Sequence, residues 1–394
     1  MPETPSTGAK LGTGHGFSLG LDFFRIFSII KTAHNIKDIK GGDYEMERKG
    51  IWVVCDNEGP QTKNDNAQEN TVALAKKCGL GEQLGTDFYQ RISVIDDIWG
   101  DFHKVAKDSS YSSGHTLKVM LPFFKAMGAT SKWLYDFAKA SIKVVPNIAG
   151  VVRSLDTKYS VRQISTSYDF FIKAYCDLIG FDFAKSACTK VPVFDGIPIS
   201  KENAEILKAF MKTVVTWPII QYDQKDGEVF PSGQTAYNCI TGFIWEFLYY
   251  LPIGSLLQSV HPVGQQQKRE VLCRLIQEHG IQREKIMYVG DSQTDFGCVQ
   301  LVKETGLSLM FNGKGKVCDI SDLMCIGEDA RAIEEVADLF AQHGREWVIE
   351  YYTPQRQVHH GIIAAVTPQN LEELKEMSSK KRKEFRGVSI GELT

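Results

Sequence analysis

The sequence predicts an α/β protein whose core is a doubly wound, mainly parallel sheet. Three short apolar runs, at residues 51–55, 161–164 and 286–289, each end at a polar side chain, which is the pattern of buried parallel strands. Helical patterns separate these runs, so strands and helices alternate along the chain. Because ligands of open α/β sheets bind at the carboxyl ends of the strands, a functional site is expected there.

Two insertions are expected to interrupt this core. Residues 67–155 carry a succession of helical patterns and predict a helical cap. Residues 181–260 predict a second insertion of mixed structure. The core is assigned to three segments, residues 46–66, 156–180 and 261–350.

The last core segment continues the alternation of helix and strand. An amphipathic helix contains Lys268 and stops at Gly280, and the strand at 286–289 follows it. The apolar run at 307–311 predicts a fourth strand, and residues 330–343 predict a helix.

Both ends of the chain are expected to lie outside the core. Residues 1–45 are interpreted as a disordered extension or as the result of a misassigned start, because a charged lead-in at Met46 runs directly into the first strand. Native peptides from before Met46, found by mass spectrometry, would contradict the second interpretation. Residues 351–394 predict a charged helical tail, whose Lys-Lys-Arg-Lys run is interpreted as a solvated helix face.

Composition argues against several classes of protein. The 45 basic and 48 acidic residues leave a formal net charge of −3, so no global field favours nucleic acid. The nine cysteines include no CxxC pair, which favours a reducing, cytoplasmic setting without zinc or disulfides. The longest apolar stretches are interrupted by charges and do not suit a membrane span. Aromatic residues in the second insertion would suit a homodimer interface.

Polar residues at the predicted strand ends form a set that suits phosphoryl transfer. That chemistry needs a carboxylate nucleophile, a divalent cation and donors for the phosphoryl oxygens. Three predicted strand ends and one helix place such groups where they can converge. The residues concerned are Asp56 and Glu58, Ser165 and Thr166, Lys268, and Asp291 and Asp295.

The acidic members predict a nucleophile and a metal site. Asp56 is assigned as the nucleophile, and with Asp291 it would hold Mg²⁺, a cation that favours oxygen ligands. The backbone carbonyl of Glu58 and water molecules would complete the coordination. Asp295, four residues after Asp291, would orient that shell or reach the metal through water.

The remaining members are assigned to the phosphoryl group and the leaving group. Ser165 and Thr166 would donate to phosphoryl oxygens, and Lys268 would neutralise negative charge on the phosphoryl group and on Asp56. Glu58 would protonate the leaving alkoxide and then activate the hydrolytic water.

Each residue also has a structural alternative when it is taken singly. Asp56 could serve a strand-end turn, Ser165 a helix N-cap, and Lys268 a solvated helix start. Their joint occurrence in one order favours the site. Four cap residues could reach a substrate carboxylate, but surface solvation is the preferred interpretation for Arg91, His103, His115 and Lys118.

These motifs resemble the haloacid dehalogenase superfamily, and within it the phosphoserine phosphatase-like branch. The likeness covers residues 51–321, with Ile-Ser-Thr-Ser-Tyr where that branch commonly has Ile-Ser-Gly-Gly-Phe. The first motif, Asp-Asn-Glu-Gly-Pro, is similar to that of a little-characterised subfamily best represented in archaea. The resemblance implies a Rossmann-like core, Mg²⁺ dependence and an aspartyl-phosphate intermediate.

One departure concerns the general acid. Most phosphatases of the superfamily place Asp two residues after the nucleophile, whereas this chain has Glu58. The extra methylene moves the carboxyl group, and a displacement of about 1 Å can cost on the order of 100-fold in rate. Either the loop compensates for the longer side chain, or general acid catalysis is weak.

The expected function is therefore a Mg²⁺-dependent phosphatase acting on a small phosphorylated metabolite. Two alternatives stay open. One is a phosphoryl-transferring mutase, which uses the same nucleophile but protects the intermediate from water. The other is a regulatory or scaffold protein that has kept the core without its chemistry.

Overall fold

The computed structural model describes residues 50–102, 105–387 and 390. The predicted N-terminal extension at 1–45 and the proposed start at Met46 lie outside these residues. Everything below therefore concerns the remainder of the chain.

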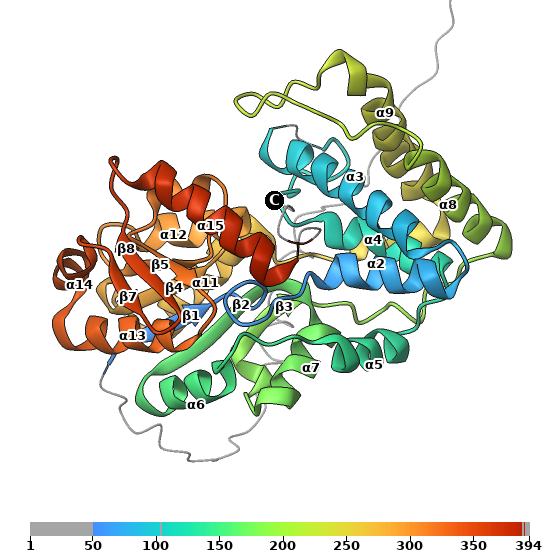
Figure 1. Ribbon diagram of the computed structural model, residues 1–394. Helices are drawn as coiled ribbons and strands as arrows, with labels where there is room; N and C mark the ends of the chain where they lie inside the picture. Colours follow the sequence, from blue (N-terminus) through green and yellow to red (C-terminus); the bar gives the residue numbers. More distant parts are fainter. Residues whose placement is uncertain (1–49, 103–104, 388–389, 391–394) are drawn as a thin grey trace, which may run out of the picture. The chain divides into compact units, whose positions relative to one another are not determined.

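A mixed, mostly parallel sheet of eight strands forms the core, in the order β3-β2-β1-β4-β5-β6-β8-β7 (Figure 1). The first six strands of this order are parallel, whereas β8 is antiparallel to β6 and to β7. The prediction of an α/β fold with a doubly wound sheet is confirmed. The strands are β1 (Trp52–Cys55), β2 (Ser160–Tyr168), β3 (Ser186–Thr189), β4 (Ile286–Gly290), β5 (Leu307–Phe311), β6 (Leu323–Gly327), β7 (Arg356–Val358) and β8 (Gly361–Ala365).

Helices cover both faces of the sheet, each over its own hydrophobic cluster. Strand order reverses at β1, which has β2 on one side and β4 on the other, and such a reversal creates a crevice at the strand ends. One face carries α6 (Ile148–Lys158), α7 (Asp169–Ile179), α13 (Arg331–His343) and α14 (Arg345–Tyr352). The other carries α11 (Gln265–His279), α12 (Phe296–Val302) and α15 (Leu371–Arg386).

The two predicted insertions share one hydrophobic core and form a single cap. For example, Phe123 of the first insertion stacks on Phe210 of the second, with ring centroids 6.2 Å apart. The cap helices are α2 (Asn66–Lys77), α3 (Glu82–Asp101), α4 (Thr116–Ala126), α8 (Lys201–Val214), α9 (Pro231–Gly242) and α10 (Ser255–Ser259), and α5 (Ser131–Ser141) lies between cap and core. Short helical turns are η1 (Phe183–Lys185), the π-helix η2 (Phe243–Phe247), η3 (Leu248–Tyr250), η4 (Pro252–Gly254), η5 (Arg283–Lys285), η6 (Gln293–Asp295) and η7 (Lys316–Ile320).

Three segments differ from the predicted boundaries. Helix α6 spans the predicted end of the cap at residue 155 and packs on the sheet beside α13. Strand β3 falls inside the predicted second insertion but forms an edge of the sheet. The predicted charged tail at 351–394 is more than a tail, because it contributes β7 and β8 to the sheet before α15 begins.

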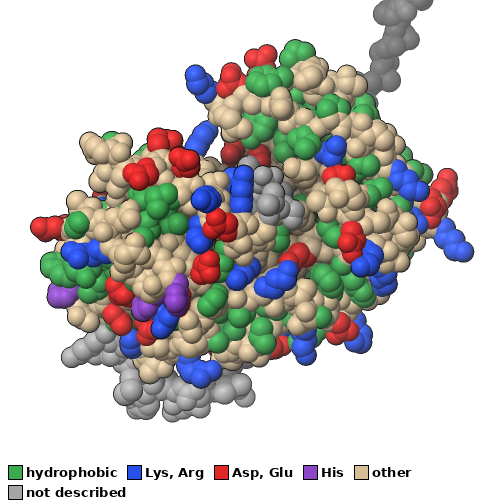
Figure 2. Space-filling view, in the orientation of Figure 1, with side chains coloured by type: hydrophobic (Ala, Val, Ile, Leu, Met, Phe, Trp, Pro, Cys, Tyr) green, Lys and Arg blue, Asp and Glu red, His purple; other side chains and the backbone are tan. Residues whose placement is uncertain are grey.

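Acidic and basic side chains are interspersed over the face shown in Figure 2, as the near-neutral formal charge leads one to expect. Phe247 and Tyr250, from the aromatic part of the second insertion, are exposed. In the described part of the chain, only a bent helix pair, Pro231–Tyr250 with Pro252–Ser259, has the length and composition of a membrane span, and its two halves meet at 102°.

Candidate active site

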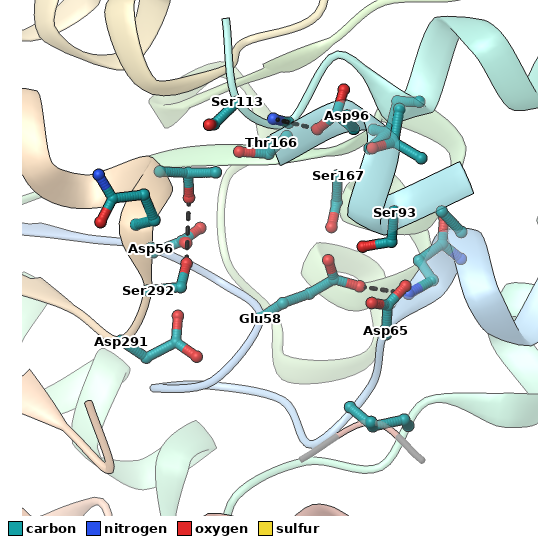
Figure 3. Close-up of a pocket in the computed structure, with 18 of the residues that line it drawn as sticks. Asp56, Glu58, Asp65, Ser93, Asp96, Ser113, Thr166, Ser167, Asp291 and Ser292 are labelled. Atoms are coloured by element: carbon teal, nitrogen blue, oxygen red, sulfur yellow. Dashed lines mark hydrogen bonds between the residues drawn. The ribbon is translucent and has the colours of Figure 1, made fainter. Parts of the chain in front are cut away.

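The carboxyl ends of β1, β2 and β4 open into a pocket between the sheet and the cap (Figure 3). The cavity has a volume of about 100 Å³. Among the predicted site residues, five line it, and Lys268 lies behind them against Asp56. The lining members of the predicted set are Asp56, Glu58, Ser165, Thr166 and Asp291, with Asp295 beneath them in contact with Asp291.

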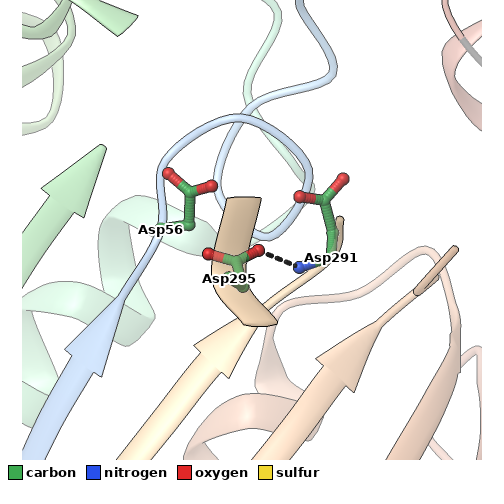
Figure 4. A group of neighbouring side chains, drawn as sticks. All are labelled: Asp56, Asp291 and Asp295. Carbon is green, nitrogen blue, oxygen red and sulfur yellow. Dashed lines mark hydrogen bonds between the residues drawn. The ribbon is translucent and has the colours of Figure 1, made fainter. Parts of the chain in front are cut away.

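A group of three buried carboxylates stands at the end of the pocket nearest the sheet (Figure 4). Asp56 follows β1, Asp291 follows β4, and Asp295 closes the turn η6. One oxygen from each of the three side chains lies within 4.8 Å of the others. Because all three donors are carboxylate oxygens, the group suits a hard divalent cation. These three residues could therefore hold a metal ion.

Local hydrogen bonds fix the geometry of this group. The backbone amide of Asp56 donates to the carbonyl of Val289 at 2.9 Å, which ties the end of β1 to β4. The Asp295 carboxylate accepts from the backbone amides of Asp291, at 2.9 Å, and Ser292, at 3.1 Å. Asp295 thus holds the loop that presents Asp291.

Lys268 is fully buried and lies between two of the carboxylates. Its Nζ donates to Asp56 at 2.5 Å and to Asp295 at 2.8 Å, and the hydroxyl of Tyr288 donates to the same oxygen of Asp295 at 2.7 Å. Burial alone would lower the pKa of Lys268, but Asp295 and Asp56 raise it, so the ammonium group stays charged. The alternative of a solvated helix-start lysine does not apply.

Burial raises the pKa of the Asp56 carboxyl to about 7, although Lys268 opposes that shift. Asp295 and Asp291 add to the rise because like charges resist ionisation of a third acid. A further positive charge near Asp56 would lower its pKa and favour the ionised form.

Glu58 points away from the three carboxylates. Its carboxylate accepts a hydrogen bond of 2.6 Å from the backbone amide of Asn66, at the start of α2. Burial and the neighbouring Asp65 raise the pKa of Glu58 well above its ordinary value. A protonated carboxyl group in this pocket is suited to proton donation. The role predicted for the Glu58 backbone carbonyl in metal binding stays a prediction.

Hydroxyl groups at the end of β2 face the same pocket. Ser165 is fully buried, and its Oγ accepts from the amide of Ser167 at 3.3 Å. The buried hydroxyl oxygen of Thr166 has no hydrogen-bond partner within the described residues. Buried polar atoms are rarely left unpaired, so the Thr166 hydroxyl is available to a ligand.

Two arginines of α15 were not predicted as site residues. Arg382 and Arg386 line the pocket, and both donate to Asp291, Arg386 at 3.1 Å. Arg386 also donates to the carbonyls of Lys63, at 3.1 Å, and Asn64. The interpretation of the Lys-Lys-Arg-Lys run as a solvated face is wrong at Arg382, which is only 4% exposed.

The sequence carried a signal that one face of α15 is packed, although nothing in it identified Asp291 as a partner. Ser378, Arg382 and Phe385 are all buried and fall at helical spacing on one side of α15. An uncharged or apolar residue at each end of this stripe indicates a packed face, even though lysines surround it.

The described cap residues that were considered as contacts for a substrate carboxylate instead contact other protein groups. Lys118 and His115 are buried, so the interpretation of these two side chains as solvated surface residues is wrong. Lys118 pairs with Asp108, and a ring nitrogen of His115 lies 3.1 Å from the side-chain oxygen of Gln267. Arg91 is half-buried and donates to the carbonyl of Trp217. His103 lies outside the described residues.

Gly59 gives a test of how closely the first loop packs on Asp291. It has a φ of +104°, and a Cβ at this position would lie 2.1 Å from the Asp291 Cγ. We expect Gly59→Ala to displace Asp291, to cost about 1–3 kcal/mol of unfolding free energy, and to weaken divalent cation binding. Chemical denaturation and calorimetry measure the two effects.

The matched control is Gly79→Ala. Gly79 also has a positive φ, +82°, but nothing lies within 4 Å of an added Cβ. It should therefore show the backbone strain without the loss of cation binding. Equal cation affinities in the two variants would contradict the proposed contact with Asp291.

No family model matches the chain, and no curated protein matches it. Among solved structures, gene product AF1437 from Archaeoglobus fulgidus has a TM-score of 0.72 at 22% sequence identity, over 87% of this chain and 99% of that chain. A substrate-bound phosphoserine phosphatase has a TM-score of 0.42 at 14% identity, over 73% of this chain and 98% of that chain. A HAD family hydrolase, t0658 from Salmonella enterica serovar Typhi, has a TM-score of 0.38 at 12% identity, over 77% of this chain and 76% of that chain. The first likeness shows a shared fold, and the other two scores are too low to add to it.

Proposed function

We propose that this protein is a Mg²⁺-dependent phosphatase that hydrolyses a small phosphate monoester through a phosphorylated Asp56. The observation that carries the proposal is the convergence of Asp56 with Asp291, Asp295 and Lys268 at the carboxyl ends of β1 and β4, beside a pocket of small-molecule size. A scaffold protein has no need to bury three carboxylates and a lysine together at a pocket. The resemblance of the motifs to the haloacid dehalogenase superfamily supports the same chemistry.

The first half of the reaction forms the phosphorylated enzyme. A carboxylate oxygen of Asp56 attacks phosphorus as the bond from phosphorus to the ester oxygen breaks. Glu58, protonated at the start, gives its proton to the leaving oxygen, so the alcohol departs neutral. Ser165 and Thr166 donate to the phosphoryl oxygens during the transfer.

The second half returns the enzyme to its initial state. Glu58, now ionised, takes a proton from a water molecule while that water attacks phosphorus. The bond between phosphorus and Asp56 breaks, which releases inorganic phosphate and restores the aspartate. Mg²⁺ held by Asp56, Asp291 and Asp295 would offset the repulsion between the anionic nucleophile and the phosphate.

The charges around the phosphate position support a divalent cation. Lys268, Arg382 and Arg386 carry three positive charges, which balance the three carboxylates of the metal group. A bound Mg²⁺ would leave two net positive charges, which match the two negative charges of a phosphate monoester. Both arginines would then be available to the phosphoryl oxygens as well as to Asp291.

We expect Arg382→Gln to lower kcat/KM by about 10- to 100-fold, because it removes a charged donor from the phosphate position. Steady-state kinetics at saturating Mg²⁺ would measure the loss. Lys380→Gln is the matched control, since Lys380 is exposed on the same helix. Unchanged kinetics for Arg382→Gln in a folded protein would show that the guanidinium group does not reach the substrate.

The function itself is tested by release of free phosphate from p-nitrophenyl phosphate and from a panel of phosphorylated metabolites, with Mg²⁺ or with EDTA. We expect turnover that needs Mg²⁺ and yields many phosphate ions per enzyme molecule. A mutase would release little free phosphate. Absence of turnover on every compound, in folded protein with Mg²⁺ present, would contradict the proposed function.

A further inference from the structure

The end of the pocket away from Asp56 is acidic. Asp65 and Asp96 line it from the cap side, and Glu58 stands between them and the metal group (Figure 3). Asp97, the neighbour of Asp96 in α3, also lines the pocket. Within the described residues, the basic side chains in the lining are Arg382 and Arg386. No cationic group of the described cap residues lines this end. An anionic substituent placed here would therefore meet like charges.

Burial raises the pKa values of Asp65 and Glu58, and the charge of Arg386 opposes that rise, but the hydrogen bonds of the two arginines are made elsewhere. Arg386 directs its guanidinium group to Asp291 and to two backbone carbonyls of the loop before α2. Arg382 donates to Asp291 and, at 3.4 Å, to the carbonyl of Asn312. The hydrogen bonds of both arginines are thus made to Asp291 and to backbone carbonyls.

Asn66 supplies an independent sign that a ligand binds at this end. It lines the pocket and is 1% exposed, yet neither its side-chain oxygen nor its side-chain nitrogen has a hydrogen-bond partner among the described residues. A buried amide without partners is costly, so it is normally paired. Ser167 adds a hydroxyl group that points towards Glu58 in Figure 3.

We propose that Asp65, Asn66 and Asp97 form a subsite, here called the cap subsite, for the alcohol portion of the substrate, and that it selects an alcohol bearing an ammonium group. The proposal rests on the proposed phosphatase function and names the substrate class. An ammonium group offers three donors, which suit the carboxylate oxygens and the amide oxygen of the subsite. A carboxylate substituent would offer none and would be repelled.

Asp65 is the residue best placed to test the selection. Its Oδ1 accepts from the backbone amide of Gln68 at 2.9 Å, which caps α2, and from the hydroxyl of Tyr89 at 3.1 Å. Asparagine caps helices as well as aspartate does and has the same shape. Asp65→Asn therefore removes the negative charge while it keeps the local structure.

Three two-carbon phosphate monoesters form the test set. They carry an ammonium group (O-phosphoethanolamine), a hydroxyl group (2-hydroxyethyl phosphate) or a carboxylate (2-phosphoglycolate). We expect kcat/KM to fall in that order, with a difference of about 10- to 100-fold between the first and the last. In Asp65→Asn the ratio of the first to the last should fall at least about tenfold. A purely structural role for Asp65 would lower all three values together and leave their ratio unchanged.

Binding to Asp56→Asn protein, measured by calorimetry with Mg²⁺ present, separates this proposal from the function. The variant lacks the nucleophile, so the order of affinities does not depend on turnover. The control is Asp136→Asn, the same change at an exposed position of α5. Equal affinity for the three esters, or preference for the carboxylate, would overturn the cap subsite even if the protein hydrolyses phosphate esters. The expected order of affinities would support the subsite whatever the rate of hydrolysis.

Discussion

Asp56→Asn should reduce Mg²⁺-dependent phosphate release by on the order of 10⁴-fold or more, because an amide cannot serve as the nucleophile. The loss should appear in kcat. The substitution preserves the shape of the side chain, but its single amide oxygen can keep only one of two hydrogen bonds, because Asn57 donates to Oδ1 of Asp56 and Lys268 donates to Oδ2. Single-turnover and steady-state assays, with circular dichroism to verify folding, would measure the effect.

Asp136→Asn serves again as the matched control for this loss, because it makes the same chemical change on an exposed helix. It should retain full turnover. Substantial activity in folded Asp56→Asn protein would mean that another group attacks phosphorus, or that water attacks directly.

Lys268→Met should destabilise the fold by about 3–5 kcal/mol, the usual cost of removing one partner from a buried ion pair. The variant would leave Asp56 and Asp295 buried without the cation that lies between them. Denaturant unfolding measures the loss of free energy, and turnover should fall as well. Methionine fills a similar volume, so a cavity contributes little to the change.

Lys303→Met is the corresponding control, since Lys303 is exposed after α12. It should change the unfolding free energy by less than about 0.5 kcal/mol. If Lys268→Met were as stable as this control, the ion pairs of Lys268 would not contribute to the stability of the protein.

The parts of the fold predicted from sequence are those in which burial leaves a local pattern. The continuous apolar runs of β1, β4 and β5 indicated strands buried on both faces, and the structure has strands at those positions. Strands β3 and β7 have only four and three residues, and both lie at edges of the sheet. Such short edge strands carry too little periodicity to be separated from loops.

The site residues likewise divide into those marked by a local sequence pattern and those whose role depends on tertiary contacts. Asp56 and Asp291 stand directly after apolar strands, so their position in the sequence already placed them at the edge of the sheet. Arg382 is buried because it contacts Asp291, which lies 91 residues away in the chain. A lysine- and arginine-rich run has the same local sequence whether it is solvated or paired. The pairing depends on tertiary contacts that no local pattern reports.

The boundary between cap and core could not be predicted from local sequence patterns either. The two insertions carry separate helical patterns, but their apolar residues meet in one cluster only when the chain folds. The unpartnered amide of Asn66 follows from that closure, since the cap buries a side chain that begins α2.

The most direct test of the account is to trap the phosphorylated enzyme. Acid quenching during turnover, reduction with borohydride and peptide mass spectrometry convert an aspartyl phosphate to homoserine and locate it. We predict homoserine at position 56 in the wild type with substrate and Mg²⁺, and none in Asp56→Asn. Turnover without homoserine at position 56, or with the modification at another acid, would contradict the central claim that Asp56 carries the phosphoryl group.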